Sequence, residues 1–79
     1  MILGTFTWRG MEIEADSLTS EVAGETIWLN RVDTGPATGI GILRNGRLHL
    51  TRFAPTDDTA TIQLRAAFDA FQAKALGPS

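Results

Sequence analysis

The sequence predicts an α+β fold: a five-stranded antiparallel β-meander (two hairpins plus a central strand) with one C-terminal α-helix packed on one face. Three observations predict it. Two pairs of alternating segments flank two-residue turns, a further alternating segment lies between them, and the last part of the chain has apolar residues at helical spacing. The 79 residues are expected to form a single ββ-β-ββ-α domain, residues 1–79.

The first hairpin is predicted from strict alternation in residues 2–8 and 11–16 around a turn at Arg9-Gly10. Such a turn pairs Trp8 with Met11, Phe6 with Ile13 and Gly4 with Ala15, and places Ile2 further along the same side. That apolar side is expected to face the core. The opposite side carries Thr5, Thr7, Glu12, Glu14 and Asp16.

The middle of the chain is expected to hold one loop and one strand. Residues 17–24 have no clear period and read as a loop, whereas residues 25–33 alternate and predict a third strand. Ile27 and Leu29 share one side of that strand, and Trp28 lies on the other. Because both sides carry large apolar groups, we expect a central strand, or one whose outer side is covered.

The second hairpin has the strongest local signal, Asn45-Gly46, between residues 39–44 and 47–53. A two-residue loop pairs Arg44 with Arg47, Leu43 with Leu48, Ile42 with His49, Gly41 with Leu50 and Ile40 with Thr51. The leucines share the core face, where Gly41 leaves room for another group to approach. The opposite face is expected to carry Ile40, Ile42, Arg44, Arg47, His49 and Thr51.

A C-terminal helix is predicted after Pro55, which ends the preceding strand. Thr56 or Asp57 is expected to cap it, and Gly77 with Pro78 to end it. Its apolar stripe consists of Ala60, Leu64, Ala67, Phe68, Phe71 and Ala75.

Composition excludes several functional classes. The absence of cysteine excludes disulfides and thiolate metal sites. No apolar run is long enough to span a membrane, and the N-terminus lacks the basic region of a secretory signal, so a cytoplasmic location is expected. The net charge of −2 is far from the basic balance of a general nucleic-acid binder.

Catalysis and metal binding find little support, so we expect neither an enzyme, nor a cofactor, nor a metal site. The single histidine, His49, has no acidic residue among its predicted neighbours to orient it. Glu12, Glu14 and Asp16 lie roughly 6.5–7 Å apart along one strand face, too far apart for neighbours to share an ion readily. Residues 35–41 are glycine-rich but lead into a strand, whereas phosphate-binding loops lead into a helix.

Two groups of residues are candidates for binding a partner. Glu12, Glu14 and Asp16 either form a solvated face or imitate a phosphate backbone. The basic residues Arg44, Arg47 and His49 either protect a sheet edge or contact an acidic surface. Trp28 belongs to this second group as a candidate anchor, because with Ile40 and Ile42 it forms an uncovered apolar patch unless the register of its strand turns it inward.

These observations favour a small non-enzymatic protein that binds another protein or a ribonucleoprotein complex through its sheet surface. The alternative is a structural or assembly protein, a homodimer or virion component, joined through the Trp28 face or the helix side with Ala66, Ala70 and Ala73. In size, acidity and plan, though without a shared motif, the chain resembles phage-encoded inhibitors, anti-CRISPR proteins among them. The resemblance implies steric blockade of a bacterial effector complex.

Overall fold

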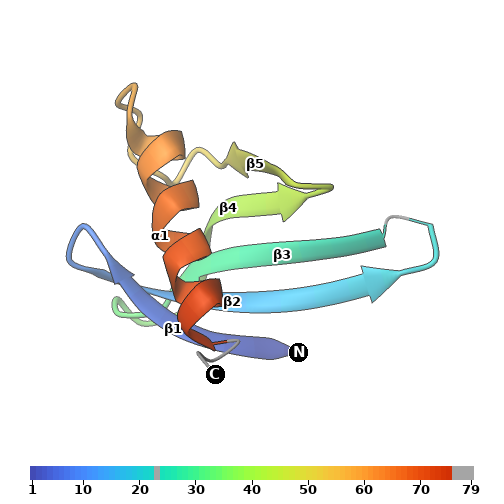
Figure 1. Ribbon diagram of the computed structural model, residues 1–79. Helices are drawn as coiled ribbons and strands as arrows, with labels where there is room; N and C mark the ends of the chain where they lie inside the picture. Colours follow the sequence, from blue (N-terminus) through green and yellow to red (C-terminus); the bar gives the residue numbers. More distant parts are fainter. Residues whose placement is uncertain (23, 76–79) are drawn as a thin grey trace.

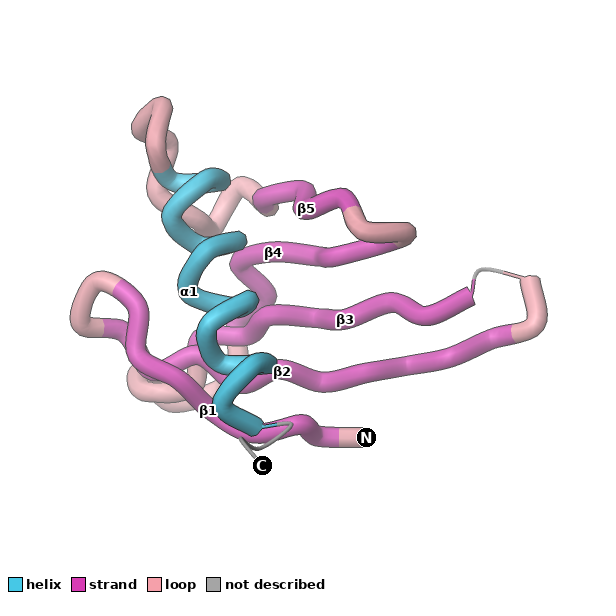
Figure 2. Tube along the Cα trace, in the orientation of Figure 1, coloured by secondary structure: helices cyan, strands magenta, loops and turns pink. Residues whose placement is uncertain are grey.

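The computed structural model describes residues 1–22 and 24–75 and confirms the predicted fold. In these residues the elements are β1 (Ile2–Trp8), β2 (Met11–Ser20), β3 (Gly24–Arg31), β4 (Thr38–Arg44), β5 (Arg47–Leu50) and α1 (Ala60–Ala75) (Figure 1). The strands form one antiparallel sheet in chain order, β1-β2-β3-β4-β5. The helix lies across one face of this sheet (Figure 2).

Both predicted hairpins have the same turn geometry. Arg9 and Gly10 have φ of 52° and 76°, and Asn45 and Gly46 have φ of 52° and 79°. Two successive positive φ angles match the type I′ turn, whose twist suits the strands that it joins. The confirmed pairs are Trp8 with Met11, Phe6 with Ile13, Gly4 with Ala15, Arg44 with Arg47, Leu43 with Leu48, Ile42 with His49 and Gly41 with Leu50.

Two register shifts move isoleucines to the side opposite to the prediction. A shift between Ile2 and Gly4 pairs Ile2 with Asp16, and the Ile2 side chain is 59% exposed. A second shift after Leu29 leaves Ile40 without a β3 partner, and Ile40 is 1% exposed in the core. Because side chains alternate with a period of two, one extra residue reverses the face on which a side chain lies.

The predicted loop at residues 17–24 is wrong, because β2 continues to Ser20 and β3 begins at Gly24. Together these strands form a hairpin that extends past α1 (Figure 1). Residues 18–20 are exposed, so no buried face imposes the alternation by which a strand is recognised. Main-chain pairing with β3 places this segment in the sheet.

The strand predicted over residues 47–53 is shorter than expected and ends at Leu50. The Thr51 hydroxyl accepts a hydrogen bond from the Phe53 N–H (3.2 Å), and the Thr51 carbonyl accepts one from the Ala54 N–H (3.1 Å). These local bonds form a turn in place of the sheet ladder, as threonine hydroxyls commonly do.

The helix begins at Ala60, so the predicted caps at Thr56 and Asp57 are wrong. The Asp57 carboxylate is bound instead by Arg9 in the β1–β2 turn, with N···O distances of 2.5 and 2.8 Å. Arg9 also donates to Gln63 of α1 at 2.6 Å, so the turn is tied to the start of the helix. The helix end expected at Gly77 and Pro78 lies outside the described residues.

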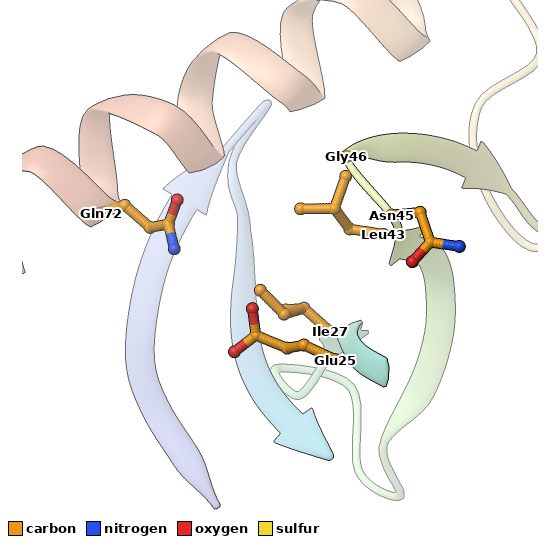
Figure 3. A pocket seen from close by; sticks show the side chains of 6 residues that line it. All are labelled: Glu25, Ile27, Leu43, Asn45, Gly46 and Gln72. Carbon is orange, nitrogen blue, oxygen red and sulfur yellow. The ribbon is translucent and has the colours of Figure 1, made fainter. Parts of the chain in front are cut away.

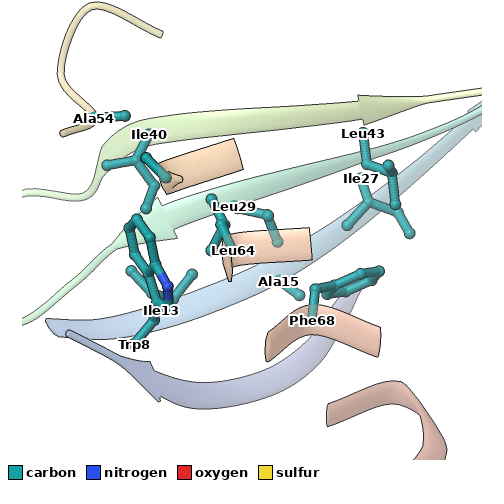
Figure 4. Packing of buried hydrophobic residues seen from close by; sticks show 11 residues of the cluster. Trp8, Ile13, Ala15, Ile27, Leu29, Ile40, Leu43, Ala54, Leu64 and Phe68 are labelled. Carbon is teal, nitrogen blue, oxygen red and sulfur yellow. The ribbon is translucent and has the colours of Figure 1, made fainter. Parts of the chain in front are cut away.

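The core lies between α1 and the sheet (Figure 4). The helix buries Ala60, Leu64 and Phe68, whereas Ala75 of the predicted stripe is exposed. A Cβ atom at Gly41 would lie 3.4 Å from Leu64 Cδ2, which confirms that this glycine leaves room for a neighbour. The sheet contributes Trp8, Ile13, Ala15, Ile27, Leu29, Ile40 and Leu43.

Within the described residues no helix has the length and apolar character needed to cross a membrane.

Candidate functional site

The sheet face opposite α1, which we call the reverse face, carries all the side chains predicted for partner binding. Ile13 and Ala15 of β2 are buried on the helix side, so the residues that alternate with them point the other way. The reverse face therefore carries Glu12, Glu14, Asp16, Trp28, Ile42, Arg44, Arg47 and His49.

One row of side chains crosses the reverse face at its centre. Asp16 pairs with Trp28, Trp28 with Ile42, and Ile42 with His49, so four neighbouring strands contribute to it. The expectation that Trp28 and Ile42 share the uncovered side is confirmed, whereas Ile40 lies in the core. With strands about 4.8 Å apart, Asp16 and His49 lie roughly 14 Å from each other.

A second row lies nearer the β4–β5 turn. Leu18 pairs with Thr26, Thr26 with Arg44, and Arg44 with Arg47. Leu18 is 55% exposed, whereas Thr26 is 6% exposed although it faces away from the helix. A shallow pocket in this region is lined by Leu18, Thr19, Ser20, Gly24, Thr26, Trp28 and Arg44.

Several charged side chains outside the reverse face form ion pairs, whereas most of those on the reverse face do not. Arg9, Arg31 and Arg65 each form an ion pair, with Asp57, Asp33 and Asp69 respectively. The hydrogen bonds from Arg9 and Arg31 hold the pKa values of Asp57 and Asp33 below the ordinary carboxyl value.

By contrast, four charged side chains of the reverse face make neither a hydrogen bond nor an ion pair within residues 1–22 and 24–75: Glu12, Glu14, Arg44 and Arg47. Asp16 is held by the amino group of Met1 at 3.0 Å. The reverse face therefore presents an acidic region on β2 and a basic region on β4 and β5, with Trp28 between them.

His49 lies at the outer strand of this face with Ile42 as its cross-strand partner. A shallow pocket there is lined by Ile42, Arg44 and His49. In the described part of the chain, no group of three or more histidine, cysteine or acidic residues is placed to hold a metal ion.

The helix side has its own small pocket, of about 220 Å³, where the sheet extends past α1 (Figure 3). Gln72 of α1 and Glu25 of β3 line it from opposite sides, together with Ile27 and Leu43. Ser17 donates a hydrogen bond to the Glu25 carboxylate at 3.1 Å. None of the residues predicted for partner binding lines this pocket, so it is separate from the reverse face.

The sequence alone does not place the acidic group and the group of Trp28 with the basic residues on one surface. The structure brings them to one face, and it adds Leu18 and Ile2, both exposed, to the apolar residues there. The register between β2 and β3 brings the two groups together, and the sequence of residues 17–24, which predicts a loop, does not indicate that register.

No protein-family model, curated protein or solved structure gives a significant match to the chain.

Proposed function

We propose that this protein is a non-enzymatic binding module whose reverse face docks on another protein or on a ribonucleoprotein complex. One observation carries the proposal. The face that α1 leaves uncovered combines Trp28 with charged side chains that have no partner in the described chain, whereas three arginines elsewhere are paired.

Trp28 is the proposed anchor, because tryptophan and arginine dominate the binding energy of protein interfaces. Ile42 beside it extends the apolar centre, and Arg44 and Arg47 lie next to that centre. A partner that fits has an apolar recess for the indole ring and an acidic patch for the two arginines.

The acidic residues complete the proposed specificity. Glu12 and Glu14 lie on β2, on the other side of Trp28 from the basic region, and fit a basic patch on the partner. Charges of opposite sign at the two ends of one face fix the orientation of docking and accelerate encounter. The proposed action is steric: the chain occupies a surface of a bacterial effector complex, as in the phage-encoded inhibitors that it resembles in outline.

The test compares the wild-type chain with surface variants as immobilised bait in a bacterial lysate. We expect Trp28→Ala, and separately the double variant Arg44→Glu/Arg47→Glu, to reduce capture of the wild-type partner by about 30-fold or more. The control is Asp58→Lys, which reverses an exposed charge just before α1 and should leave capture unchanged. Nuclease treatment of the lysate distinguishes a protein partner from a ribonucleoprotein complex.

Equal capture of that partner by the wild type and by both variants, with each variant folded as judged by circular dichroism, would exclude the reverse face as the docking surface. Loss of capture by Asp58→Lys as well would point to a surface near the start of α1.

A further inference from the structure

We propose that this chain forms a twofold dimer in which β1 of one copy pairs antiparallel with β1 of a second copy, with Phe6 at the twofold axis. The inference rests on the edge of the sheet and on its register, and it does not depend on the function proposed for the reverse face.

The two outer strands of the sheet differ in how they are protected. β5 has four residues and carries Arg47 and His49, and short, charged strands are a common defence against edge-to-edge pairing. β1 has seven residues and carries neither a charged residue nor a proline. Its one irregularity lies between Ile2 and Gly4, so the stretch from Gly4 to Trp8 is a regular, unprotected edge.

The hairpin register shows which main-chain groups of β1 point outward. In a two-residue hairpin the pair beside the turn, Trp8 and Met11, exchanges both hydrogen bonds, and bonded and non-bonded pairs then alternate. Thr7 and Thr5 occupy the non-bonded positions, so their N–H and C=O groups point away from β2. In the described chain β1 pairs with no strand other than β2.

This arrangement is complementary to itself. The two outward-pointing residues lie on either side of Phe6, so a twofold axis through Phe6 places Thr5 of each copy opposite Thr7 of the other. Both threonine pairs can then exchange two N–H···O bonds, and threonine pairs are favourable across antiparallel strands. A twofold interface requires a surface that is complementary to a second copy of itself, and this edge meets that requirement.

The helix leaves space for the second strand. A groove of about 410 Å³ runs between β1 and α1, lined by Thr5, Phe6, Thr7, Ala67, Ala70, Phe71 and Lys74. In the views of Figures 1 and 2, β1 is the outermost strand and α1 crosses above it. The small side chains of Ala67 and Ala70 allow the second copy to approach closely at this point.

A twofold axis at the sheet edge, perpendicular to the sheet, joins the two sheets into one continuous sheet. Both helices then lie on one side of it and both reverse faces on the other. The dimer would therefore present two copies of the reverse face in the same direction, which favours partners with repeated sites.

The experiment measures the mass of the full chain by sedimentation equilibrium from micromolar to millimolar concentration. We expect the wild type to approach twice its 8.5 kDa chain mass as concentration rises. In Thr5→Lys/Thr7→Lys each lysine faces Glu14 or Glu12 within its own chain, but two lysines oppose each other across each pair of the dimer. We expect this variant to dimerise at least about tenfold more weakly.

The matched variant is Thr5→Lys/Thr7→Glu, which places opposite charges across the same two pairs and should dimerise about as well as the wild type. A further variant, Thr7→Pro, removes an outward N–H while sparing the hydrogen bonds to β2, and should lose the dimer. A wild-type chain that stays monomeric at all concentrations, or equal dimerisation of all these variants, would overturn the proposal.

Failure of this proposal can be told apart from failure of the proposed function. Arg44→Glu/Arg47→Glu alters the reverse face and should leave the dimer mass unchanged. Conversely, Thr7→Pro adds no charge opposite Glu12 or Glu14, so its monomer keeps the charges of the reverse face and retains Trp28, Arg44 and Arg47 for a partner.

Discussion

Gly4 lies where β1 passes beneath the aromatic residues of α1. Its φ of +143° lies in a region that other residues rarely adopt, and a Cβ atom there would lie 3.0 Å from Cζ of Phe71. The Phe71 ring is stacked on Phe6 with 5.3 Å between centroids, and Phe68 packs beside both. The absence of a side chain at Gly4 therefore permits both the bend of β1 and the contact with Phe71.

We predict that Gly4→Ala destabilises the protein by about 1–3 kcal/mol, because the backbone strain adds to the displacement of the Phe71 ring. Chemical denaturation of both chains measures the difference in free energy of unfolding. Gly35→Ala is the matched control, since Gly35 also has a positive φ (+104°) but no atom within 4 Å of an added Cβ. An equal cost for both substitutions would mean that packing against Phe71 contributes nothing.

At the scale of elements, the ion pair between Arg9 and Asp57 joins the β1–β2 turn to the start of α1. The guanidinium binds both carboxylate oxygens, and these hydrogen bonds hold the pKa of Asp57 well below its ordinary value near 4. The native state thus binds fewer protons at this carboxyl than the unfolded chain between the two pKa values. The stabilisation is complete above pH 4 and is lost as the pH falls below 4 towards the lower pKa of the folded state.

We therefore predict that Arg9→Ala lowers the free energy of unfolding at pH 7 and that its deficit relative to the wild type shrinks from pH 4 towards pH 2. Urea titrations at several pH values measure the deficit. Lys74→Ala is the control and should differ from the wild type by a constant amount. A deficit of Arg9→Ala that stays constant over this range would show that the ion pair does not couple protonation to folding.

The elements that the sequence predicts well are those in which a turn fixes a register. Arg9-Gly10 and Asn45-Gly46 each determine the pairing of two strands, and the alternation beside them indicates which side is buried. Prediction fails where an interaction distant in sequence decides the outcome. The helix begins at Ala60, with the Gln63 N–H donating to the Thr59 carbonyl, and the Asp57 carboxylate that was expected to cap it binds Arg9, 48 residues away along the chain.

At the scale of the whole molecule, the sequence predicts the side of its own strand on which each candidate residue lies, but not that all of these residues share one face of the sheet. Trp28 was placed correctly because its neighbours Ile27 and Leu29 pack against the helix side. Glu14 and Arg44 lie on one face because β2 pairs with β3. The sequence does not predict this pairing, since the last pair of the hairpin is Ser20 with Gly24 and the connection is longer than a two-residue turn. Sequence patterns predict the face of each hairpin, but they predict the composite surface only once every register is known.

The hairpin of β2 and β3 has neighbouring strands on both sides near its base but not at its tip. β1 ends opposite Asp16 and β4 ends opposite Thr26, so within the described chain residues 18–20 and 24–25 belong to a two-stranded ribbon. It also extends past α1 (Figure 1). Two-stranded ribbons without a packed face are marginally stable in water, so this tip should open without unfolding the rest of the molecule.

We predict that the hydrogen-bonded amides of residues 18–20, 24 and 25 exchange with solvent at least about 100-fold faster than those of Ala15 and Leu29, which lie under the helix. Native-state hydrogen exchange in increasing denaturant measures this, because local opening is insensitive to low denaturant whereas global unfolding is not. Equal protection at the two places would show that the whole sheet opens as one unit. Since Leu18 and Thr26 line the pocket beside Trp28, a partner that docks on the reverse face should slow exchange at the hairpin tip more than in the core.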